Sequence, residues 1–303
     1  MTSAALHRAA FRAMASDCDI TLAYSPQQGR AWAEQQAQRA IHEIRRIEAK
    51  YSRYQSDSLV SRINAAAGQS PVPIDPETRQ LFDFADRMHQ QSGGLFDLTS
   101  GVFRRAWNFQ AAQCPSAAQL DALRPLVGWS RVQRQASSVY LPTPGMEIDL
   151  GGIGKEYAAD RAAAVLRQHG VQHALINLGG DLVSIGPKPD ASPWTVGIRH
   201  PRQAGQIIAT LSLSGQALAT SGDYERYFEQ GGQRYCHILN PHTGWPVQHF
   251  QSVSVTAPSC LLAGAISTLL MLQQSQATPQ VIQSLGLPVL WVDAAGQIHA
   301  HTA

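Results

Sequence analysis

The chain of 303 residues carries 24 basic and 22 acidic side chains, which gives a formal net charge of +2. Its Lys and Arg residues are not clustered, which argues against a nucleic-acid-binding surface. Hydrophobic residues make up 44% of the chain, enough for a sizeable core, and the length is compatible with a single two-lobed domain over residues 1–303.

The N-terminal residues 1–24 lack the apolar core of a secretory signal. No apolar stretch approaches the roughly 18 residues that a membrane-spanning helix needs. The cysteines are scattered and form no C-x-x-C pair, a pattern typical of unpaired thiols in a reducing compartment; they are Cys18, Cys114, Cys236 and Cys260. We therefore expect a cytoplasmic protein without membrane contact, with a leader removed beforehand as the alternative.

Apolar periodicity predicts the elements of the first half. Alternation predicts a strand over residues 17–24, and helical spacing predicts helices from Arg30 to about Tyr51 and around residues 81–88. The intervening residues 55–76 are rich in turn formers, which predicts a connecting segment. A third helix is predicted over residues 154–170, where Gly170 would end it.

Short strand patterns predominate in the second half, followed by a last helix after Pro258 with Ser259 as its N-cap, and by a closing hairpin around Gly296. Helices followed by strands, rather than alternating units, predict an α+β fold of mostly antiparallel strands with flanking helices. The strand patterns lie in residues 173–186, 194–200, 207–215, 216–222, 234–240 and 251–257.

Four glycine-rich segments each contain an aspartate: residues 92–101, 148–160, 177–182 and 219–224. Glycine lets backbone N–H groups approach a ligand closely, and a helix N-terminus favours anions. The sequence GGIGK that leads into the third helix therefore predicts a phosphate cradle with Lys155 as its countercharge. It matches neither standard nucleotide-binding glycine motif, so a purely structural turn is the alternative.

Two histidines lie in the sequence RYCHILNPHTGWP, residues 234–246. His237 ends a predicted strand and His242 lies in the following turn. The pair lacks the i, i+4 helical spacing of zinc-binding histidines, so a two-histidine metal site is not expected. His237 is either a general base for a hydroxyl nucleophile or a solvated ring without a catalytic role. We interpret His242 as part of the turn.

Taken in order, eight segments resemble the ApbE family of FAD:protein FMN transferases. The resemblance implies an ApbE-like fold, and a reaction in which the FMN half of FAD is transferred to a threonine hydroxyl of an acceptor protein, with release of AMP and use of Mg²⁺. The segments are FRAMAS (11–16), YSRYQSDSLVSRIN (51–64), GGLFDLTSGVFRRAWNF (93–109), IDLGGIGKEYAADRA (148–162), NLGGDLVSIG (177–186), ATSGDYERYF (219–228), CHILNPHTGWPV (236–247) and VSVTAPSCLLAGAISTLLML (253–272).

The resemblance also implies roles for individual residues. His237 would be the base that deprotonates the threonine, and Lys155 would lie on the phosphate side together with the backbone of Gly151 and Gly152. Two of the implied FAD contacts, Tyr54 and Phe96, have an alternative interpretation as partly buried aromatic residues. The complete set of implied FAD contacts is Met14, Tyr54, Leu95, Phe96, Asp97, Asp149, Gly151, Lys155 and Leu239.

The chain departs from the family at the metal motif A-D-A-x-[DA]-T, where residues 263–268 read AGAIST. A carboxylate at position 264 and a hydroxyl at position 268 would share one helix face and hold one ion. Gly264 has no side chain, which leaves Thr268, Ser267 and the carbonyl near Gly152 as the implied metal ligands. Mg²⁺ usually has one or two carboxylate ligands in addition to phosphates and water.

This departure leaves several possibilities open. The phosphates of FAD supply most of the ligands, or another carboxylate, such as Asp181 or Asp223, replaces the missing one. Alternatively, the chain binds FAD without transferring FMN, or it uses water as the acceptor and is an FAD pyrophosphatase.

Overall fold

The structure is a computed structural model that describes residues 4–273 and 278–302. Its central feature is an eight-stranded sheet whose neighbouring strands all run antiparallel. In spatial order the strands are β1 (Ala5–Ala13), β2 (Ser16–Tyr24), β6 (Ala174–Leu178), β7 (Asp181–Ile185), β10 (Ala217–Gly222), β13 (Phe250–Ala257), β14 (Val289–Asp293) and β15 (Ile298–His301).

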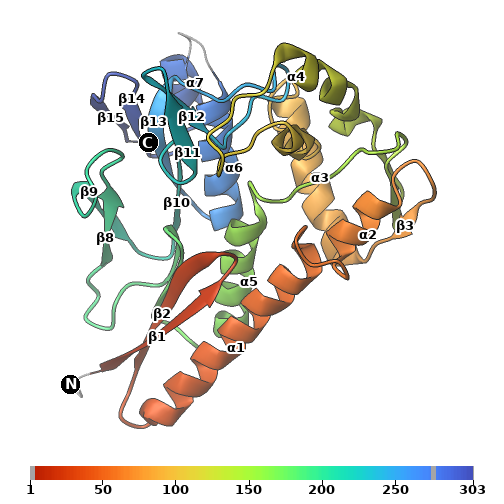
Figure 1. Cartoon of the computed structure of the whole chain (residues 1–303). Helices are drawn as coiled ribbons and strands as arrows, with labels where there is room; N and C mark the ends of the chain where they lie inside the picture. The colour runs from red at the N-terminus through yellow and green to blue at the C-terminus, as the bar shows by residue number, and fades with distance from the viewer. Residues whose placement is uncertain (1–3, 274–277, 303) are drawn as a thin grey trace.

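Three helices cover one face of this sheet (Figure 1): α1 (Gly29–Tyr51), α5 (Gly154–Gln168) and α6 (Cys260–Leu272). The buried residues of α1 recur every three or four positions, so one apolar stripe faces α5. The facing residues of α5 include four fully buried alanines, whose small side chains let the helices pack closely. The helix α6 lies over β10 and β13.

A second lobe lies beyond these helices in Figure 1. It contains α2 (Leu59–Ala65), α3 (Pro76–Gln91), α4 (Ala117–Leu123), a small sheet of β3 (Val72–Pro73), β5 (Ser138–Tyr140) and β4 (Gln133–Arg134), and the 3-10 turns η1 (Ser100–Arg105), η2 (Arg124–Leu126) and η3 (Trp129–Arg131). Two hairpins and one short helix complete the described residues: β8 (Trp194–Arg199) with β9 (Ile207–Leu213), β11 (Tyr227–Gln230) with β12 (Gln233–Cys236), and α7 (Thr278–Ser284).

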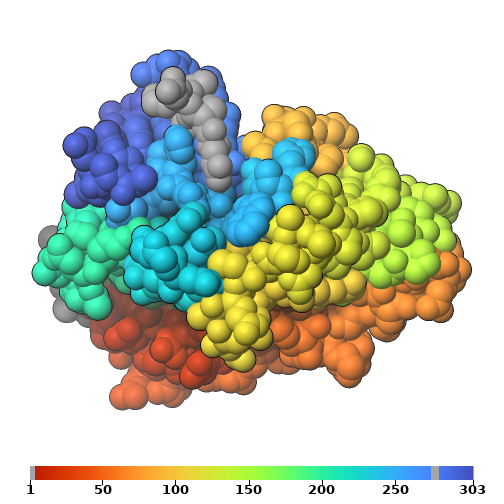
Figure 2. Space-filling model, turned by 45° about the horizontal axis from the view of Figure 1, so that its top comes forward, coloured from red at the N-terminus to blue at the C-terminus, as the bar shows by residue number. Residues whose placement is uncertain are grey.

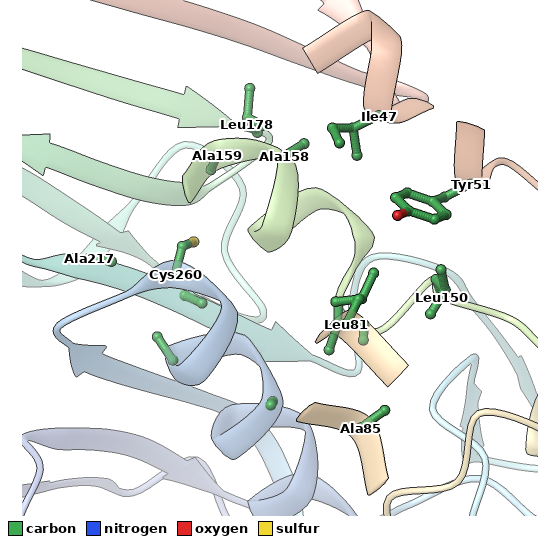
Figure 3. Close-up of a cluster of buried hydrophobic side chains, with 14 of the residues drawn as sticks. Ile47, Tyr51, Leu81, Ala85, Leu150, Ala158, Ala159, Leu178, Ala217 and Cys260 are labelled. Atoms are coloured by element: carbon green, nitrogen blue, oxygen red, sulfur yellow. The ribbon is translucent and has the colours of Figure 1, made fainter. Parts of the chain in front are cut away.

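One buried apolar cluster connects both lobes (Figure 3). Ile47 of α1 and Leu178 of β6 belong to the sheet side, whereas Leu81 and Ala85 of α3 belong to the second lobe. Leu150, just before α5, lies in the same cluster. A core shared in this way supports the proposal that residues 1–303 form one domain, because neither lobe could bury these side chains alone.

The α+β fold of mostly antiparallel strands is confirmed, as are the N-cap of α6 and the closing hairpin. The Oγ of Ser259 accepts a hydrogen bond of 3.3 Å from the backbone N–H of Leu262. Gly296 has a φ of +85°, a backbone conformation that favours glycine in a tight turn. All four cysteines are free. In the described part of the chain, no helix is long and apolar enough to cross a membrane.

The prediction of a connecting segment over residues 55–76 is wrong, because α2 lies within it. The Oγ of Ser58 accepts from the N–H of Ser61, which caps the helix, and Leu59, Val60 and Ile63 are buried. This short apolar face lies among turn-forming residues, so it produces no helical periodicity long enough to be recognised in the sequence. The edge strand β1 and the short helix α7 were also not predicted; β1 is mostly exposed or half-buried, so its apolar alternation is weak.

Candidate active site

The four glycine-rich segments, far apart in the sequence, meet at one end of α5. The backbone N–H of Asp149 donates to the carbonyl of Leu98 at 2.8 Å, which joins the first segment to the second. Lys155 Nζ lies 2.6 Å from Asp181 Oδ2, which joins the second to the third. The carboxylate of Asp181 also interacts with the backbone N–H of Thr220 in the fourth.

The N-terminus of α5 is open to solvent. Gly151 and Gly152 are exposed, and α5 has no side-chain N-cap. The Oδ1 of Asp149 accepts from the N–H of Gly151 at 2.9 Å, and its Oδ2 lies 3.2 Å from Arg53 Nη1. The uncapped N–H groups of the first turn therefore face a region that an anion can reach.

Gly101 allows the two loops at this position to approach. A Cβ at Gly101 would lie 2.6 Å from the Cβ of Asp149, closer than two carbon atoms can pack. The glycine at this position of η1 is thus required by the approach of the Asp149 turn.

Lys155 is charged and held in place by Asp181. Burial lowers the pKa of Lys155, but the negative charge of Asp181 at 2.6 Å outweighs this effect, so the net shift is upward. Burial also raises the pKa of Asp181, whereas Lys155 opposes that change. The ammonium group is therefore a fixed positive charge beside the glycine turn.

His237 lies directly after β12, which ends at Cys236, so the predicted strand over residues 234–240 is too long. Its backbone N–H donates to the carbonyl of Arg226 at 3.0 Å. The side chain is exposed, and among the described residues its ring has no hydrogen-bond partner. Enough protein surrounds the ring that desolvation, followed by the positive charge of Arg226, lowers the pKa of His237 below its ordinary value.

The turn after His237 is anchored to the second lobe. Asn240 Oδ1 accepts from the N–H groups of His242 and Thr243, and the indole N–H of Trp107 donates to the carbonyl of Gly244 at 2.8 Å. The ring of His242 packs on Gly94, with Cε1 3.3 Å from where a Cβ would lie. In Figure 2 this light-blue turn lies against the yellow segment around residues 100–120. The interpretation of His242 as part of the turn agrees with these contacts.

Three of the implied FAD contacts have side chains that solvent reaches. Tyr54 is 72% exposed, with the Arg53 guanidinium 4.7 Å from its ring centre. Met14 and Leu95 are half-buried at the surface of the core. The backbone of Met14 has a φ of +52°, and its N–H donates to Glu48 Oε1 at 2.6 Å.

Phe96 and Asp97 have inward side chains. Phe96 is 4% exposed, so the alternative of a buried aromatic residue describes its ring. The Oδ1 of Asp97 accepts from the N–H of Thr99 at 2.7 Å, and its Oδ2 accepts from the N–H of Trp129 at 2.9 Å. Leu239 is half-buried and pairs with Pro246 in an isolated bridge. Phe96 and Asp97 therefore position loops and have only backbone atoms available to a ligand, whereas the half-buried side chain of Leu239 is partly accessible.

The position of the missing carboxylate, Gly264, faces α5. Ser267 is buried and its hydroxyl donates to the carbonyl of Gly264 at 3.0 Å. Ser221 Oγ lies 2.8 Å from Ser267 Oγ and 3.1 Å from Thr268 Oγ1, which connects β10 to α6. These hydroxyl and carbonyl oxygens suit a hard cation such as Mg²⁺.

Neither of the two carboxylates considered as replacements is free. Asp181 is paired with Lys155. Both carboxylate oxygens of Asp223 accept from Arg202, each at 2.7 Å. The carboxyl group that lies beside Gly264 belongs to Glu156, which was not among the residues predicted from the sequence.

Glu156 is in the first turn of α5 and is 7% exposed. A Cβ at Gly264 would lie 2.5 Å from its Cγ and 2.7 Å from its Oε1, and Oε2 has no hydrogen-bond partner. Burial, and then the charge of Asp181, raise the pKa of Glu156 to about 8. The acid in the motif GGIGKE was visible in the sequence, but its proximity to Gly264 was not.

The structure also has two surface depressions outside this region. One of about 590 Å³ is lined by α1 and α5 residues including Arg39, His42 and His169, and one of about 430 Å³ lies near Lys50 and Arg62. Neither of these two contains an implied site residue.

Known proteins resemble this chain in sequence and structure. A sequence model of the ApbE family matches residues 14–291. A relative from Klebsiella pneumoniae (strain 342), named FAD:protein FMN transferase, is 38% identical over 240 residues, 77% of this chain and 74% of that protein. The crystal structure of the ApbE protein from Thermotoga maritima has a TM-score of 0.88 at 30% identity and covers 97% of this chain and 96% of its own. The crystal structure of Pseudomonas stutzeri flavinyl transferase ApbE in its apo form has a TM-score of 0.86 at 29% identity, and the match covers 99% of this chain and 95% of that one. The chain belongs to the ApbE family.

Proposed function

We propose that this protein is an FAD:protein FMN transferase that transfers FMN from FAD to a threonine hydroxyl of an acceptor protein and releases AMP. The relatives named above support this activity. The observation that carries the proposal is the state of His237: the residue is exposed, its ring has no hydrogen-bond partner among the described residues, and its pKa is lowered. The charge of Lys155, beside the open N-terminus of α5, also contributes to this lowered pKa.

The proposed reaction is a displacement at phosphorus. His237, neutral at pH 7, accepts the proton of the threonine hydroxyl, whose oxygen bonds to the FMN phosphorus of FAD. The bond between that phosphorus and the bridging oxygen breaks, and the oxygen leaves with AMP. The first-turn N–H groups of α5 and the ammonium of Lys155 stabilise the negative charge that develops on the phosphates.

Gly152, Ser267 and Thr268 are the residues proposed to hold Mg²⁺, through a backbone carbonyl and two hydroxyls. A bound Mg²⁺ would screen phosphate charge. Among the proposed FAD contacts, Tyr54, Met14, Leu95, Leu239 and the exposed backbone at Gly151 are accessible to a ligand, whereas Phe96 and Asp97 would contribute backbone atoms. We also propose the cytoplasm as the location, which the four free cysteines support.

The test is incubation of the purified chain with FAD, Mg²⁺ and a protein carrying the acceptor threonine. We expect covalently bound flavin on the acceptor and an equal amount of AMP. His237→Ala should abolish both, whereas His242→Ala, which changes a turn residue, should retain transfer. Normal transfer by His237→Ala would show that the base is another residue.

Two other outcomes correspond to the alternative functions. Tight FAD binding with no AMP release would indicate a flavin-binding protein, the alternative that the glycine at position 264 favours. Release of FMN and AMP in the absence of an acceptor would indicate an FAD pyrophosphatase.

A further inference from the structure

We propose that Glu156, in the first turn of α5, supplies the carboxylate ligand of the divalent cation that the family places on α6 at position 264. This inference rests on the proposed function, because the cation would be bound together with the phosphates of FAD. Compared with the family motif, the acidic side chain would thus come from α5 and not from α6, but would lie at the same place in the site.

The space above Gly264 is the first argument. A Cβ at this position would lie 2.5, 2.7 and 2.8 Å from Cγ, Oε1 and Cδ of Glu156. The carboxylate of Glu156 therefore occupies the volume into which an aspartate at position 264 would extend. Side chains on a helix lean toward its N-terminus, so Glu156 leans toward the turn that contains Gly152.

The unpaired oxygen is the second argument. Glu156 is 7% exposed and its Oε2 has no hydrogen-bond partner. Burial favours the protonated acid, and a cation at the open oxygen would take the place of that proton and stabilise the buried carboxylate. The neighbouring acids are already occupied: Asp181 pairs with Lys155, and Asp160 accepts from the N–H groups of Cys260 and Leu261 at 2.8 and 2.9 Å.

The ligand chemistry is the third argument. Thr268 lies one helical turn after Gly264, and Ser221 links its hydroxyl to that of Ser267. One carboxylate, one hydroxyl, a carbonyl near Gly152 and the phosphates of FAD are the oxygen ligands that Mg²⁺ prefers. The described residues hold no group of three or more His, Cys, Asp and Glu that could bind a metal by themselves, which agrees with a cation shared with the substrate.

The experiment measures binding of Mn²⁺, a paramagnetic substitute for Mg²⁺, by electron paramagnetic resonance, with and without FAD. The variants are Glu156→Gln, which removes the charge at nearly constant shape, and Glu156→Ala/Gly264→Asp, which returns the carboxylate to α6. Glu34→Gln on the exposed face of α1 removes the same charge elsewhere and is the matched control.

We expect the wild type and Glu34→Gln to bind one Mn²⁺ with the same affinity. Glu156→Gln should bind it at least about tenfold more weakly, and the double variant should recover most of the loss. Gly264→Asp alone should lower the melting temperature, because the new side chain overlaps Glu156. Thermal unfolding of every variant checks that the chains are folded.

The result that overturns the inference is Mn²⁺ binding by Glu156→Gln equal to that of the wild type, or no Mn²⁺ binding by the wild type in either arm. If the wild-type protein transfers FMN and either of these results is obtained, the role of Glu156 is rejected and the proposed function is kept. Binding of Mn²⁺ that depends on Glu156, without transfer to any acceptor, would reject the proposed function and keep the cation site.

Discussion

At the scale of single residues, the site depends on charged groups whose states are set by their surroundings. Lys155 remains an ammonium because Asp181 lies 2.6 Å away, although burial alone would favour the neutral amine. His237 is affected in the opposite sense: desolvation and the charge of Arg226 favour the neutral imidazole. The cation proposed for the phosphates and the neutral base proposed for the hydroxyl can therefore coexist at pH 7.

The pH dependence of transfer follows from the lowered pKa of His237. The base is active when unprotonated, so kcat/KM should rise with pH through this pKa, which lies below 6.5, and be constant between pH 7 and 8. Arg226→Gln removes one cause of the lowered pKa and should move the acid limb of the profile to higher pH.

Arg226→Lys keeps the positive charge and is the control, with an acid limb close to that of the wild type. The groups that influence His237 are Arg226, Glu225 and Lys155, so only the charge at position 226 differs between the two variants. An acid limb at the same pH in both would contradict the electrostatic explanation.

At the scale of elements, helix ends determine where the functional groups lie. The N-terminus of α5 is left uncapped and exposed, whereas that of α6 is capped twice, by Ser259 and by Asp160 of α5. The carboxylate of Asp160 therefore fixes the start of α6 relative to α5. The helix that this contact holds is the one whose Gly264 lies beside Glu156.

Asp160→Ala should lower the free energy of unfolding by about 1–2 kcal/mol, the usual cost of a lost helix cap, and should also slow FMN transfer because the start of α6 is no longer held. Urea unfolding and the transfer assay measure the two effects. Ser116→Ala removes the cap of α4, whose N-terminus belongs to the second lobe and not to α5 or α6. It should cost a similar free energy and leave transfer unchanged; equal slowing in both variants would refute a specific role of Asp160.

At the scale of the whole molecule, the site lies where two lobes meet. The sheet with α5 and α6 contributes Lys155, Thr268 and the glycine turn. The turn after His237 is held from the second lobe by Trp107, whose indole donates to Gly244. Gly244 itself packs on Phe103, with 3.0 Å between a hypothetical Cβ and the ring. The position of His237, the proposed base, thus depends on the contact between the lobes.

Trp107→Phe removes one buried donor and should cost about 1 kcal/mol of stability. Because the lost hydrogen bond anchors the turn, amide hydrogen exchange in residues 237–246 should become faster. The factor by which kcat falls should be larger than the factor by which FAD binding weakens. The control is Trp291→Phe, because the Trp291 ring stacks on His299 at the far edge of the sheet. It should change neither quantity, and unchanged exchange in Trp107→Phe would show that the anchor lies elsewhere.

The helices that carry long periodic patterns, the antiparallel strands and the glycine-rich segments followed from the sequence alone, since each reflects a local rule of spacing or turn chemistry. The sequence also pointed to His237 and Lys155 as candidate site residues and showed that position 264 carries no carboxylate. It did not indicate α2, whose short apolar face lies among turn formers, or the inward orientation of Asp97, whereas burial of Phe96 was one of its two interpretations.

Only the tertiary structure decided what stands in place of the missing side chain at Gly264. Glu156 and Gly264 are far apart in the sequence, and nothing in either local pattern links them. They meet because the apolar faces of α5 and α6 pack on the same sheet and Asp160 fixes how the helices align. A distance between two helices is set by packing across the core, and a one-dimensional pattern does not contain it.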